Sequence, residues 1–546
     1  MGTGVAGVAG ARSLEVRGDG SRSSSRLWKI RQQEFAARAQ RRAFALGASI
    51  EDVLMAAAER ASDRLKHDRP EFSAATLSKL ACCIPLLFGI AALIALLNSA
   101  STVALCAIVV LPAAFRVLVV ASPARRPWPV TSATTDNEPP VYTIIAPLHR
   151  EARVVDQLLS AIERLDYPAE KLDVIVIVEA DEPATRAAIT RRKHRIPITV
   201  IPAPPAEPRT KPKALNIALE LARGSLIAIY DAEDRPEPSQ LRSALQAFQF
   251  GGDGLACVQA RLCIDTDATW LARYFIAEYA GHFDVFLPKL AEFGLPLPLG
   301  GSSNHFRTAA LREVGAWDPY NVTEDADLGM RLARFGYRCG VIKSTTFEEA
   351  PTTVRRWLGQ RSRWFKGWMQ TFLVHMREPL RSFRELGPFG FAAFMLVVGG
   401  NAFVALMHPI FVAGLCWRIV FDTEASIDAT LCAISVAAGY VPTVALAWRG
   451  LSHRGVPNKL RILVWTPLHW LLLSAAAWWA AVELIFAPTR WNKTEHGLIT
   501  PQSGGPSLAK LSSHIADLER RGELPQIRIG ATCSAAGRRR RPQVSA

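Results

Sequence analysis

The chain has 546 residues, of which 49% are hydrophobic, and a formal net charge of +15 at pH 7. This length accommodates two or three domains with a substantial core, and the mean hydropathy of +0.13 is high for a purely soluble protein. The nine cysteines form no CxxC pair, which excludes a disulfide or zinc framework and indicates reduced packing residues. Because much of the basic excess lies at the chain ends and beside apolar runs, it favours anionic lipid over nucleic acid as the partner.

The first 76 residues are polar and contain no apolar signal-peptide core. Residues 1–26 are rich in Gly, Ser and Arg and are predicted to be disordered. Apolar residues at helical spacing over 28–66 predict a small helical module, which ends near Pro70. We expect this segment to stay in the cytoplasm.

Two apolar runs follow, at about 77–97 and 101–121, and each has roughly the ~20 residues that a bilayer crossing needs. The short polar segment between them indicates a tight turn, and Arg125 and Arg126 follow the second run. By the positive-inside rule this transmembrane hairpin starts and ends in the cytoplasm. The alternative is a helical hairpin buried in a soluble core.

Residues 139–345 alternate between apolar strand patterns and amphipathic helix patterns. The strands are predicted at 141–146, 172–178, 198–201 and 226–230, and the helices at 151–165, 184–192 and 213–223. This alternation predicts an α/β domain with a mostly parallel, doubly wound sheet. Since ligands bind beyond the carboxyl ends of such strands, the candidate site segments are 147–151, 179–182 and 231–234.

The acidic cluster Asp231-Ala-Glu233-Asp234 follows the strand predicted at 226–230. Mg²⁺ or Mn²⁺ bound to a diphosphate typically takes one or two protein carboxylates. Asp231 and Glu233 alternate on an extended backbone and can reach one site. The alternative is an acidic turn that caps the next helix.

A lysine pair, Lys211 and Lys213, opens the helix that precedes this strand. A lysine at a helix N-terminus can meet a phosphate together with the free backbone N–H groups. Lysines are also common on exposed helix ends, so this feature alone has little specificity.

The tripeptide Thr323-Glu324-Asp325 precedes an amphipathic helix. Asp325 is a candidate general base that takes a proton from an attacking hydroxyl. The alternative is an ordinary N-cap, in which Thr323 caps the helix and the two acids favour its dipole.

A helix rich in Trp and Arg is predicted over 353–376. Four of its side chains share one face, namely Trp357, Arg361, Trp364 and Trp368. This face predicts a helix anchored flat at the lipid headgroups, with Gln360 and Arg363 pointing into the catalytic domain. Arg363 suits a diphosphate leaving group and Trp364 a sugar ring; the alternative is an interfacial anchor without a catalytic role.

Three further apolar runs lie at about 389–421, 427–448 and 462–487. The basic linker 449–461 indicates a cytoplasmic loop, and the acidic segment 422–428 indicates the opposite side. Three simple crossings would place the tail outside, although Arg538 to Arg541 favour the inside. We therefore expect a cytoplasmic tail and a hairpin or interfacial segment within one of the three runs.

Taken together, these residues resemble the family 2 glycosyltransferases, in particular membrane-embedded synthases such as bacterial cellulose synthase and hyaluronan synthase. The resemblance covers roughly residues 77–500 and rests on four ordered motifs, VEADE at 178–182, DAED at 231–234, TED at 323–325 and QRSRW at 360–364. It implies a GT-A (Rossmann-like) fold, a UDP- or GDP-linked nucleotide sugar as donor, Mg²⁺ or Mn²⁺ as cofactor, and transfer with inversion at the anomeric carbon.

The resemblance also implies domain limits. These are a cytosolic segment at 1–76, the transmembrane hairpin at 77–121, a GT-A domain at 122–385 that ends in the interfacial helix 353–376, transmembrane helices at 386–487 and a cytosolic tail at 488–546. The segment 491–497 (WNKTEHG) looks like one found after the last span of related bacterial synthases, and we expect it to cover the site.

Each motif residue receives an implied role. The catalytic residues are Asp325, as base, and Glu324. The donor-binding residues are Glu179, Asp181, Glu182, Lys213, Asp231 and Arg363. The metal ligands are Asp231, Glu233 and Asp234. The acceptor-binding residues are Gly301 and Ser302, from the loop 300–304, with Gln360 and Trp364.

The chain departs from the family pattern in two motifs. Glu233 replaces the second Asp of the usual DxD, so the choice between Glu233 and Asp234 as metal ligand stays open. The early motif is also atypical, so Glu179 and Glu182 remain alternatives to Asp181.

The implied function is addition of sugars to a growing polysaccharide at the bacterial inner membrane, by a multi-pass protein with a cytoplasmic catalytic domain and coupled export. One alternative is a transferase that adds a single sugar to a lipid carrier. A second alternative is an inactive membrane scaffold or export component.

Overall fold

The computed structural model describes residues 50–95, 99–122, 138–205, 207–421 and 426–491. Predictions for residues 1–49 and for the tail beyond Trp491 lie outside this part of the chain. The description below concerns the described residues alone.

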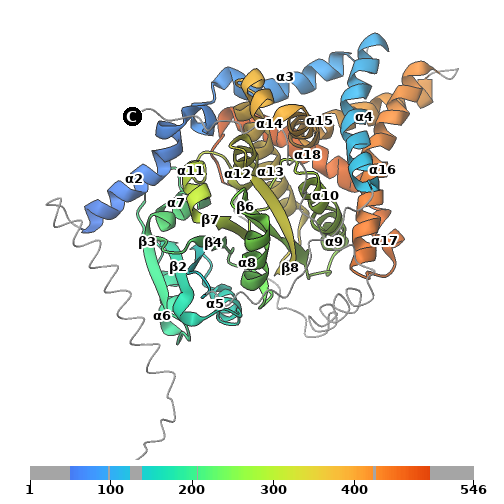
Figure 1. The fold of residues 1–546 in the computed structure, drawn as a ribbon. Helices are drawn as coiled ribbons and strands as arrows, with labels where there is room; N and C mark the ends of the chain where they lie inside the picture. The colour runs from blue at the N-terminus through green and yellow to red at the C-terminus, as the bar shows by residue number, and fades with distance from the viewer. Residues whose placement is uncertain (1–49, 96–98, 123–137, 206, 422–425, 492–546) are drawn as a thin grey trace, which may run out of the picture.

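An eight-stranded sheet forms the centre of the domain that begins near residue 138 (Figure 1). The strands are β1 Tyr142–Leu148, β2 Leu172–Glu179, β3 Ile198–Ala203, β4 Leu226–Ile229, β5 Arg235–Pro236, β6 Leu255–Ile264, β7 Asn304–Arg307 and β8 Arg338–Glu348. Their order is β3-β2-β1-β4-β7-β6-β8-β5, with β1 to β4 parallel, β6 parallel to β8, and β7 antiparallel to both neighbours. The predicted α/β fold of the GT-A type is confirmed.

Helices cover both faces of this sheet. They are α5 Val155–Glu163, α6 Pro183–Arg191, α7 Lys211–Leu221, α8 Gln240–Gly251, α9 Trp270–Gly281, α10 Leu287–Glu292, α11 Thr308–Glu313 and α12 Glu324–Arg334. Alternate residues of a strand pack against the helices on opposite faces of the sheet, because successive side chains point to opposite faces. Ile144 packs in the core with α5 and α8, and Ile145 packs in the core with α7, α9 and α12.

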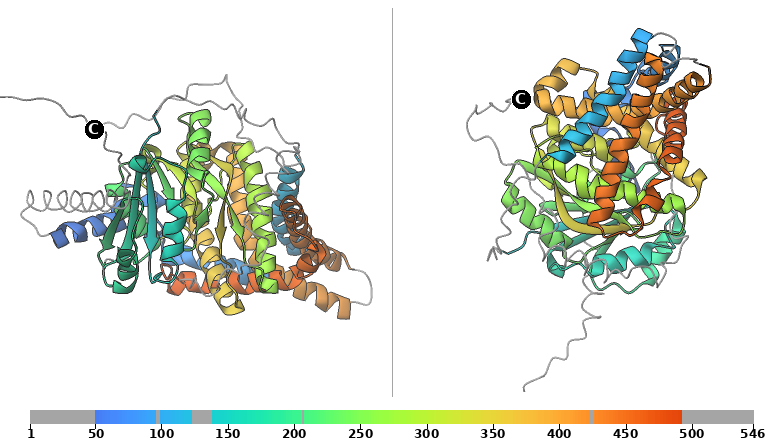
Figure 2. Two further views of the ribbon diagram at one scale, coloured as in Figure 1. Left: turned by 90° about the horizontal axis from the view of Figure 1, so that it is seen from below. Right: turned by 90° about the vertical axis from the view of Figure 1, so that its right-hand side faces the viewer.

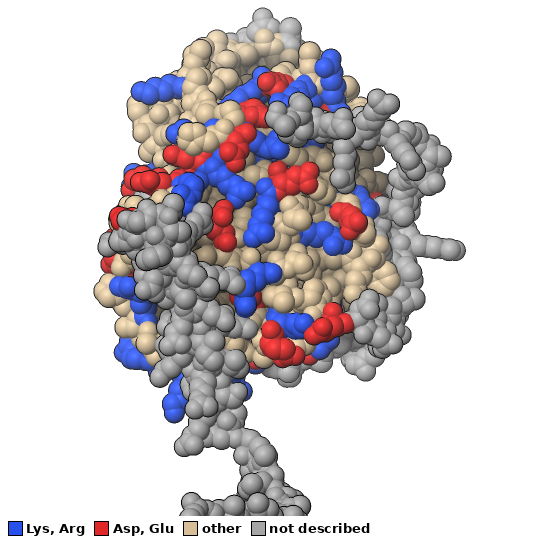
Figure 3. Space-filling model, turned by 60° about the vertical axis from the view of Figure 1, so that its left-hand side comes forward, with Lys and Arg blue, Asp and Glu red and all other residues tan. Residues whose placement is uncertain are grey.

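The helix α2 (Ile50–Asp68) packs against α7 through an apolar face that contains Ala58 and Ala61. Asn216 Nδ2 donates to the carbonyl of Ala61 at 3.2 Å, and Arg64 pairs with Glu220 at 2.9 Å. The described part of the N-terminal helical module is therefore attached to the catalytic domain. On the face shown in Figure 3, basic and acidic side chains lie interspersed among uncharged ones.

The apolar helices pack together at one side of the sheet domain. They are α3 Lys79–Ala95, α4 Ser99–Ala121, α14 Pro379–Phe394, α15 Gly400–Phe421 and α16 Ile427–His453, followed by α17 Lys459–Leu463 and α18 Thr466–Phe486. In Figure 2, α4 (blue) and α16 (orange) lie beside each other, far from β2 and β3. Four described segments are long and apolar enough to cross a membrane, at 101–121, 379–421, 427–453 and 459–486.

The run predicted at 389–421 bends before it enters the bundle. Gly387 adopts φ of +70°, a conformation that favours glycine, and separates the amphipathic first part of α14 from the apolar part. A π-helical turn at Met395–Gly399 joins α14 to α15, whereas α15 continues through Pro409. The non-helical backbone of this segment is thus at Gly387.

The predicted membrane-facing side of the Trp- and Arg-rich helix is buried inside the protein. In α13 (Val354–His375), Trp357 is 0% exposed and Arg361 is 4% exposed, and Trp364 and Trp368 pack against the main core. This face lies against the sheet domain and α18, so the expectation of a lipid-facing Trp/Arg anchor is wrong. Protein segments from elsewhere in the chain, among them α18, cover the face of α13 that was predicted to contact lipid.

The helix α18 packs along α13 and is tied to the catalytic side at both ends. At its start, Tyr274 of α9 donates to Thr466 Oγ1 at 3.1 Å. At its end, Lys366 of α13 pairs with Glu483 at 3.2 Å and donates to the carbonyl of Ala487 at 3.1 Å. A helix of this length that crossed a bilayer would separate its ends by about 30 Å along the membrane normal. Both ends of α18 therefore lie against the catalytic side.

This placement predicts the side on which the chain continues. We expect dual alkaline phosphatase and fluorescent reporters inserted near residue 456 and fused after residue 491 to report the same, cytoplasmic side. A reporter between α15 and α16 provides the control and should report the opposite side. Opposite results at 456 and 491 would contradict the assignment of α18.

Candidate functional site

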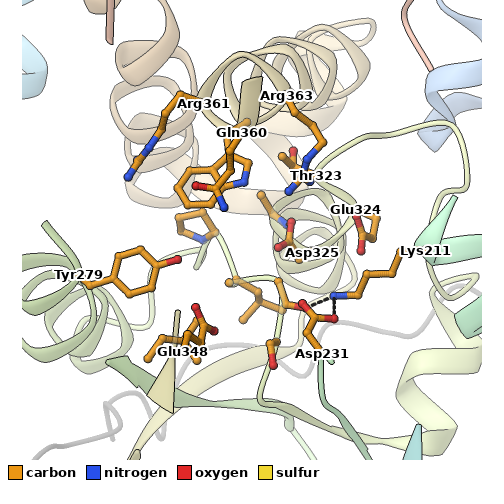
Figure 4. A pocket seen from close by; sticks show the side chains of 18 of the residues that line it. Lys211, Asp231, Tyr279, Thr323, Glu324, Asp325, Glu348, Gln360, Arg361 and Arg363 are labelled. Carbon is orange, nitrogen blue, oxygen red and sulfur yellow. Dashed lines mark hydrogen bonds and ion pairs between the residues drawn. The ribbon is translucent and has the colours of Figure 1, made fainter. Parts of the chain in front are cut away.

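A cavity of about 680 Å³ lies at the carboxyl edge of the parallel strands. It is lined by residues at or just after the ends of β1, β2, β4 and β8, by the loop before β7, by the first turn of α12 and by α13. Figure 4 shows how the charged side chains converge from these elements. The same cavity continues between the apolar helices α4, α15, α16 and α18, where Asn401 and Thr443 line it.

An ion pair between Lys211 and Asp231 lies at the centre of the polar part of this cavity (Figure 4). The Nζ atom of Lys211 is 2.5 Å from Asp231 Oδ1 and donates to the carbonyl of Gly301 at 2.6 Å. Burial acts to lower the pKa of Lys211, but Asp231 and Glu324 outweigh it and raise the pKa above its ordinary value. Lys211 is therefore a fixed positive charge among carboxylates.

Gly301 shows how closely the functional groups approach one another. A Cβ atom added at this glycine would lie 3.2 Å from Asp325 Oδ2, 3.9 Å from Asp231 Oδ2 and 3.9 Å from Lys211 Nζ. The catalytic candidate, the metal candidate and the lysine thus surround one point of the acceptor-side loop. Larger side chains at this position would fill the space where the reacting groups meet.

The remaining acids of the DAED motif differ in their access to the cavity. Glu233 lines it, and burial together with the charge of Asp231 raises the pKa of Glu233 to about 8. Asp234 is 0% exposed, and its carboxylate accepts hydrogen bonds from Ser302 Oγ and, at 2.6 Å, from the backbone N–H of Asp231. Asp234 therefore holds the strand end and the Ser302 loop together.

The TED motif opens α12 beneath α13. Asp325 lines the cavity, and burial raises its pKa, while Lys211 and Arg363 act to lower it. Burial, followed by the charge of Asp325, raises the pKa of Glu324 to about 8. Thr323 occupies the N-cap position of α12 and the two acids lie in its first turn, but the hydroxyl of Thr323 makes no capping hydrogen bond to the described helix.

Helix α13 supplies several residues to the cavity, among them Gln360, Arg363 and Trp364. Arg363 Nη1 donates to the carbonyl of Val322 at 3.1 Å, and its guanidinium lies 4.5 Å from the ring centroid of Trp491. Gln360 Oε1 is buried with no hydrogen-bond partner among the described residues, so it is free to meet a ligand. A Cβ at Gly367 would collide with Thr323, so this glycine lets α13 approach the TED motif.

The early acidic motif contributes one acidic residue to the cavity. Glu179 at the end of β2 lines it, whereas Asp181 is exposed and pairs with Arg209 at 2.7 Å. Glu182 is buried and accepts a hydrogen bond from Thr185. Asp181 and Glu182 do not line the cavity.

The two lysines of α7 lie in different environments. Lys213 is 0% exposed, pairs with Glu179 at 3.5 Å and does not line the cavity, unlike Lys211. Glu348 and Tyr279 also line the cavity beside the DAED acids, although they were not expected there. Glu348 is the last residue of β8, which is not among the predicted strands. Tyr279 lies on α9, an apolar helix in which no site residue was predicted.

The donor set fits a divalent cation that is shared with a diphosphate. Asp231 and Glu233 offer carboxylate oxygens to the cavity. Within the described residues no group of three or more His, Cys, Asp or Glu residues is arranged as a complete metal site. Mg²⁺ and Mn²⁺ commonly complete their coordination with substrate phosphates and water, so two carboxylates satisfy this chemistry.

Comparison with known proteins finds similarity to glycosyltransferases. A family model described as glycosyl transferase family group 2 matches residues 226–489. The chain is 26% identical to a probable glycosyltransferase, YdaM, of Bacillus subtilis (strain 168), over 52% of this chain and 68% of that protein. It is 23% identical to a beta-monoglucosyldiacylglycerol synthase of Synechocystis sp., over 70% of this chain and 80% of that protein.

A solved structure is similar as well. It is the mannosyltransferase PcManGT from Pyrobaculum calidifontis, in complex with GDP-Man and Mn²⁺. The two chains are 21% identical, the match covers 70% of this chain and 97% of that one, and the TM-score is 0.46.

Proposed function

The chain is a family 2 glycosyltransferase, and on that premise we propose that it transfers a sugar, with inversion, from a nucleotide-sugar donor to an acceptor that enters from the membrane. The observation that carries the proposal is the single cavity that contains Asp231, Asp325 and Arg363 and continues between apolar helices. A donor can thus enter from the catalytic domain and an acceptor from the lipid side.

The donor binds at the DAED end of the cavity. A divalent cation bound at Asp231 and Glu233 supplies positive charge to the diphosphate. Lys211 and Arg363 add two further positive charges near the same carboxylates, so they stabilise the charge that develops on the leaving group. Lys213, which was predicted to contact the diphosphate, supports Glu179 from inside the domain.

The acceptor hydroxyl binds near Asp325. This carboxylate takes the hydroxyl proton while the oxygen attacks the anomeric carbon and the bond to the diphosphate breaks. Gln360 and Trp364, from α13, line the cavity beside it and hold the acceptor or the transferred sugar. Ser302 fixes its loop through Asp234.

Two acceptors are proposed. The motif order and the flanking apolar helices favour a growing polysaccharide at the inner membrane. The long match to a glycolipid synthase favours a lipid, and the tethered ends of α18 leave fewer crossing helices to surround a polymer. Catalytic inactivity is opposed by the intact acidic cluster around Lys211.

Product size distinguishes the two acceptors. Membranes containing the full chain are incubated with labelled UDP- and GDP-sugars, and the products are separated by extraction into organic solvent and by gel filtration. A size ladder supports polysaccharide synthesis, and one extractable glycolipid supports single transfer. Absence of transfer or hydrolysis with every nucleotide sugar would overturn the enzymatic proposal.

The two lysines of α7 give a matched test of the donor site. We expect Lys211→Met to fold normally and to weaken nucleoside diphosphate binding at least tenfold, because a charged group leaves the cavity. We expect Lys213→Met to lower the free energy of unfolding by about 3 kcal/mol, because it leaves Glu179 buried without its partner. Isothermal titration calorimetry and chemical unfolding measure the two effects. The reverse pattern would return the donor role to Lys213.

A further inference from the structure

Arg116 is a basic side chain that the proposed chemistry does not use. It lies on α4 and lines the membrane end of the catalytic cavity. Its guanidinium donates through Nη2 to Asn401 Oδ1 on α15 and lies 6.0 Å from the ring centroid of Phe286. Among the described residues, no carboxylate pairs with it.

Three other buried basic side chains near this level have acidic partners. Arg361 makes two hydrogen bonds to Glu278, at 2.7 and 2.6 Å, and Arg454 pairs with Asp284. Lys366 of α13 pairs with Glu483 at 3.2 Å. Arg116 is thus distinguished by an amide partner in place of a carboxylate. An arginine among membrane helices without an acid is costly and marks a site for an anion.

The groups around Arg116 are donors or neutral. Asn401 Nδ2 makes no hydrogen bond to any described residue and is available to the cavity. Burial, followed by the charges of Arg116 and Arg361, lowers the pKa of His282 to about 4, so this neighbour is neutral near pH 7. One guanidinium and one amide therefore present N–H groups to a shared ligand, a pattern that suits a phosphate.

The depth of Arg116 matches that of a lipid phosphate. It precedes the end of α4 by five residues, which is about 7.5 Å along the helix axis. That end lies on the catalytic domain, since Lys289 Nζ donates to the carbonyl of Ser122 at 3.1 Å. The cavity walls near this level include apolar side chains, among them Phe283, Phe286, Ala405 and Leu446.

We propose that Arg116 and Asn401 bind the phosphate of an anionic membrane lipid and hold its headgroup hydroxyl toward Asp325 as the sugar acceptor. This inference rests on the proposed glycosyl transfer and names its acceptor class. In the transfer, the lipid oxygen bonds to the anomeric carbon, the bond to the diphosphate breaks, Asp325 receives the hydroxyl proton and the nucleoside diphosphate leaves. Depth and apolar walls favour a lipid over an anionic glycan.

The test measures lipid binding apart from catalysis. The purified full chain is mixed with phosphatidylcholine vesicles that contain or lack phosphatidylglycerol, and the retained lipid is measured by native mass spectrometry. We expect Arg116→Gln to lower the retention of phosphatidylglycerol at least tenfold. The same variant should raise the KM for phosphatidylglycerol as acceptor at least tenfold. Arg116→Lys should have an intermediate effect on both quantities. Arg449→Gln is the matched control and should behave as the unaltered protein, because Arg449 is exposed and does not line the cavity.

A second variant keeps the test decisive if Arg116→Gln folds poorly. Asn401→Asp places an acid against Arg116 and forms an ion pair, so it should keep the fold and still abolish phosphatidylglycerol retention. Unchanged nucleoside diphosphate binding in all variants separates this site from the donor site. Loss of lipid retention without any measurable sugar transfer would support the site and reject glycosyl transfer.

Three outcomes would overturn the inference. The first is equal phosphatidylglycerol retention by the unaltered protein and by Asn401→Asp. The second is binding of inorganic phosphate alone, with no lipid retained. The third is preference for an anionic oligosaccharide. Stronger retention of a polyisoprenyl phosphate than of phosphatidylglycerol would support the phosphate site but overturn the proposed acceptor, because a polyisoprenyl phosphate has no headgroup hydroxyl.

Discussion

Replacement of Asp325 by asparagine is expected to lower the rate of sugar transfer by about 10²- to 10⁴-fold, the range that general base catalysis contributes. Asp325 lines the cavity within 3.2 Å of the position that a Cβ at Gly301 would occupy, at the junction of the donor and membrane ends. Asparagine keeps the shape of the side chain but cannot accept the hydroxyl proton. Initial rates with labelled donor in membranes measure the loss.

Donor binding provides the control for this variant. Asp325→Asn should bind the nucleoside diphosphate with nearly unchanged affinity, because Asp231 and Lys211 remain paired. Asp166→Asn removes an exposed carboxylate that pairs with Arg242 far from the cavity, and it should leave the rate unchanged. Transfer by Asp325→Asn at close to the normal rate would refute the assignment of the base.

The second large effect is expected for Asp231→Asn, which should abolish Mn²⁺ binding and weaken nucleoside diphosphate binding together. Asp231 is the DAED carboxylate that lines the cavity and also holds Lys211 at 2.5 Å. The neighbouring Asp234 is not expected to replace it, because its side chain is buried outside the cavity lining and its Oδ2 atom accepts from Ser302 and from the backbone N–H of Asp231. Electron paramagnetic resonance of Mn²⁺ and calorimetry of nucleotide binding measure the two losses.

Comparison of Glu233 and Asp234 completes the metal test. Glu233→Gln should weaken Mn²⁺ binding, because Glu233 faces the cavity. Asp234→Asn should chiefly lower the melting temperature, because it disturbs a buried hydrogen-bonded turn. If Asp231→Asn binds Mn²⁺ normally and Asp234→Asn does not, the cation lies deeper than proposed.

These predictions depend on motifs that can be identified in the sequence and on spatial contacts that only the folded structure shows. The alternation of apolar strands with amphipathic helices predicted the parallel part of the sheet, since side-chain period reports local structure. Three residues of the segments selected by the carboxyl-edge rule, Glu179, Asp231 and Glu233, line the cavity. The strand β8, which ends in Glu348, and the antiparallel β7 were not predicted, because their pairing partners lie far away in sequence.

The choice between Lys211 and Lys213 shows the limit of local reasoning. Positions two apart on a helix differ by about 200° in direction, so only one of the two side chains faces the cavity. The packing of α7 on the sheet decides which one it is. Likewise, the Trp- and Arg-rich face of α13 has the composition of a membrane anchor, but its partners are the sheet domain and α18.

By itself, the order of residues determined the α/β class, the acidic strand end, the TED and QRSRW motifs and the apolar segments, because each depends on local period or on short-range chemistry. Tertiary structure alone decided which charges meet. It brought Lys211 against Asp231, buried Asp234, tied both ends of α18 to the catalytic side and left Arg116 facing the cavity without an acid. These outcomes depend on contacts between segments far apart in the chain, which no local pattern records.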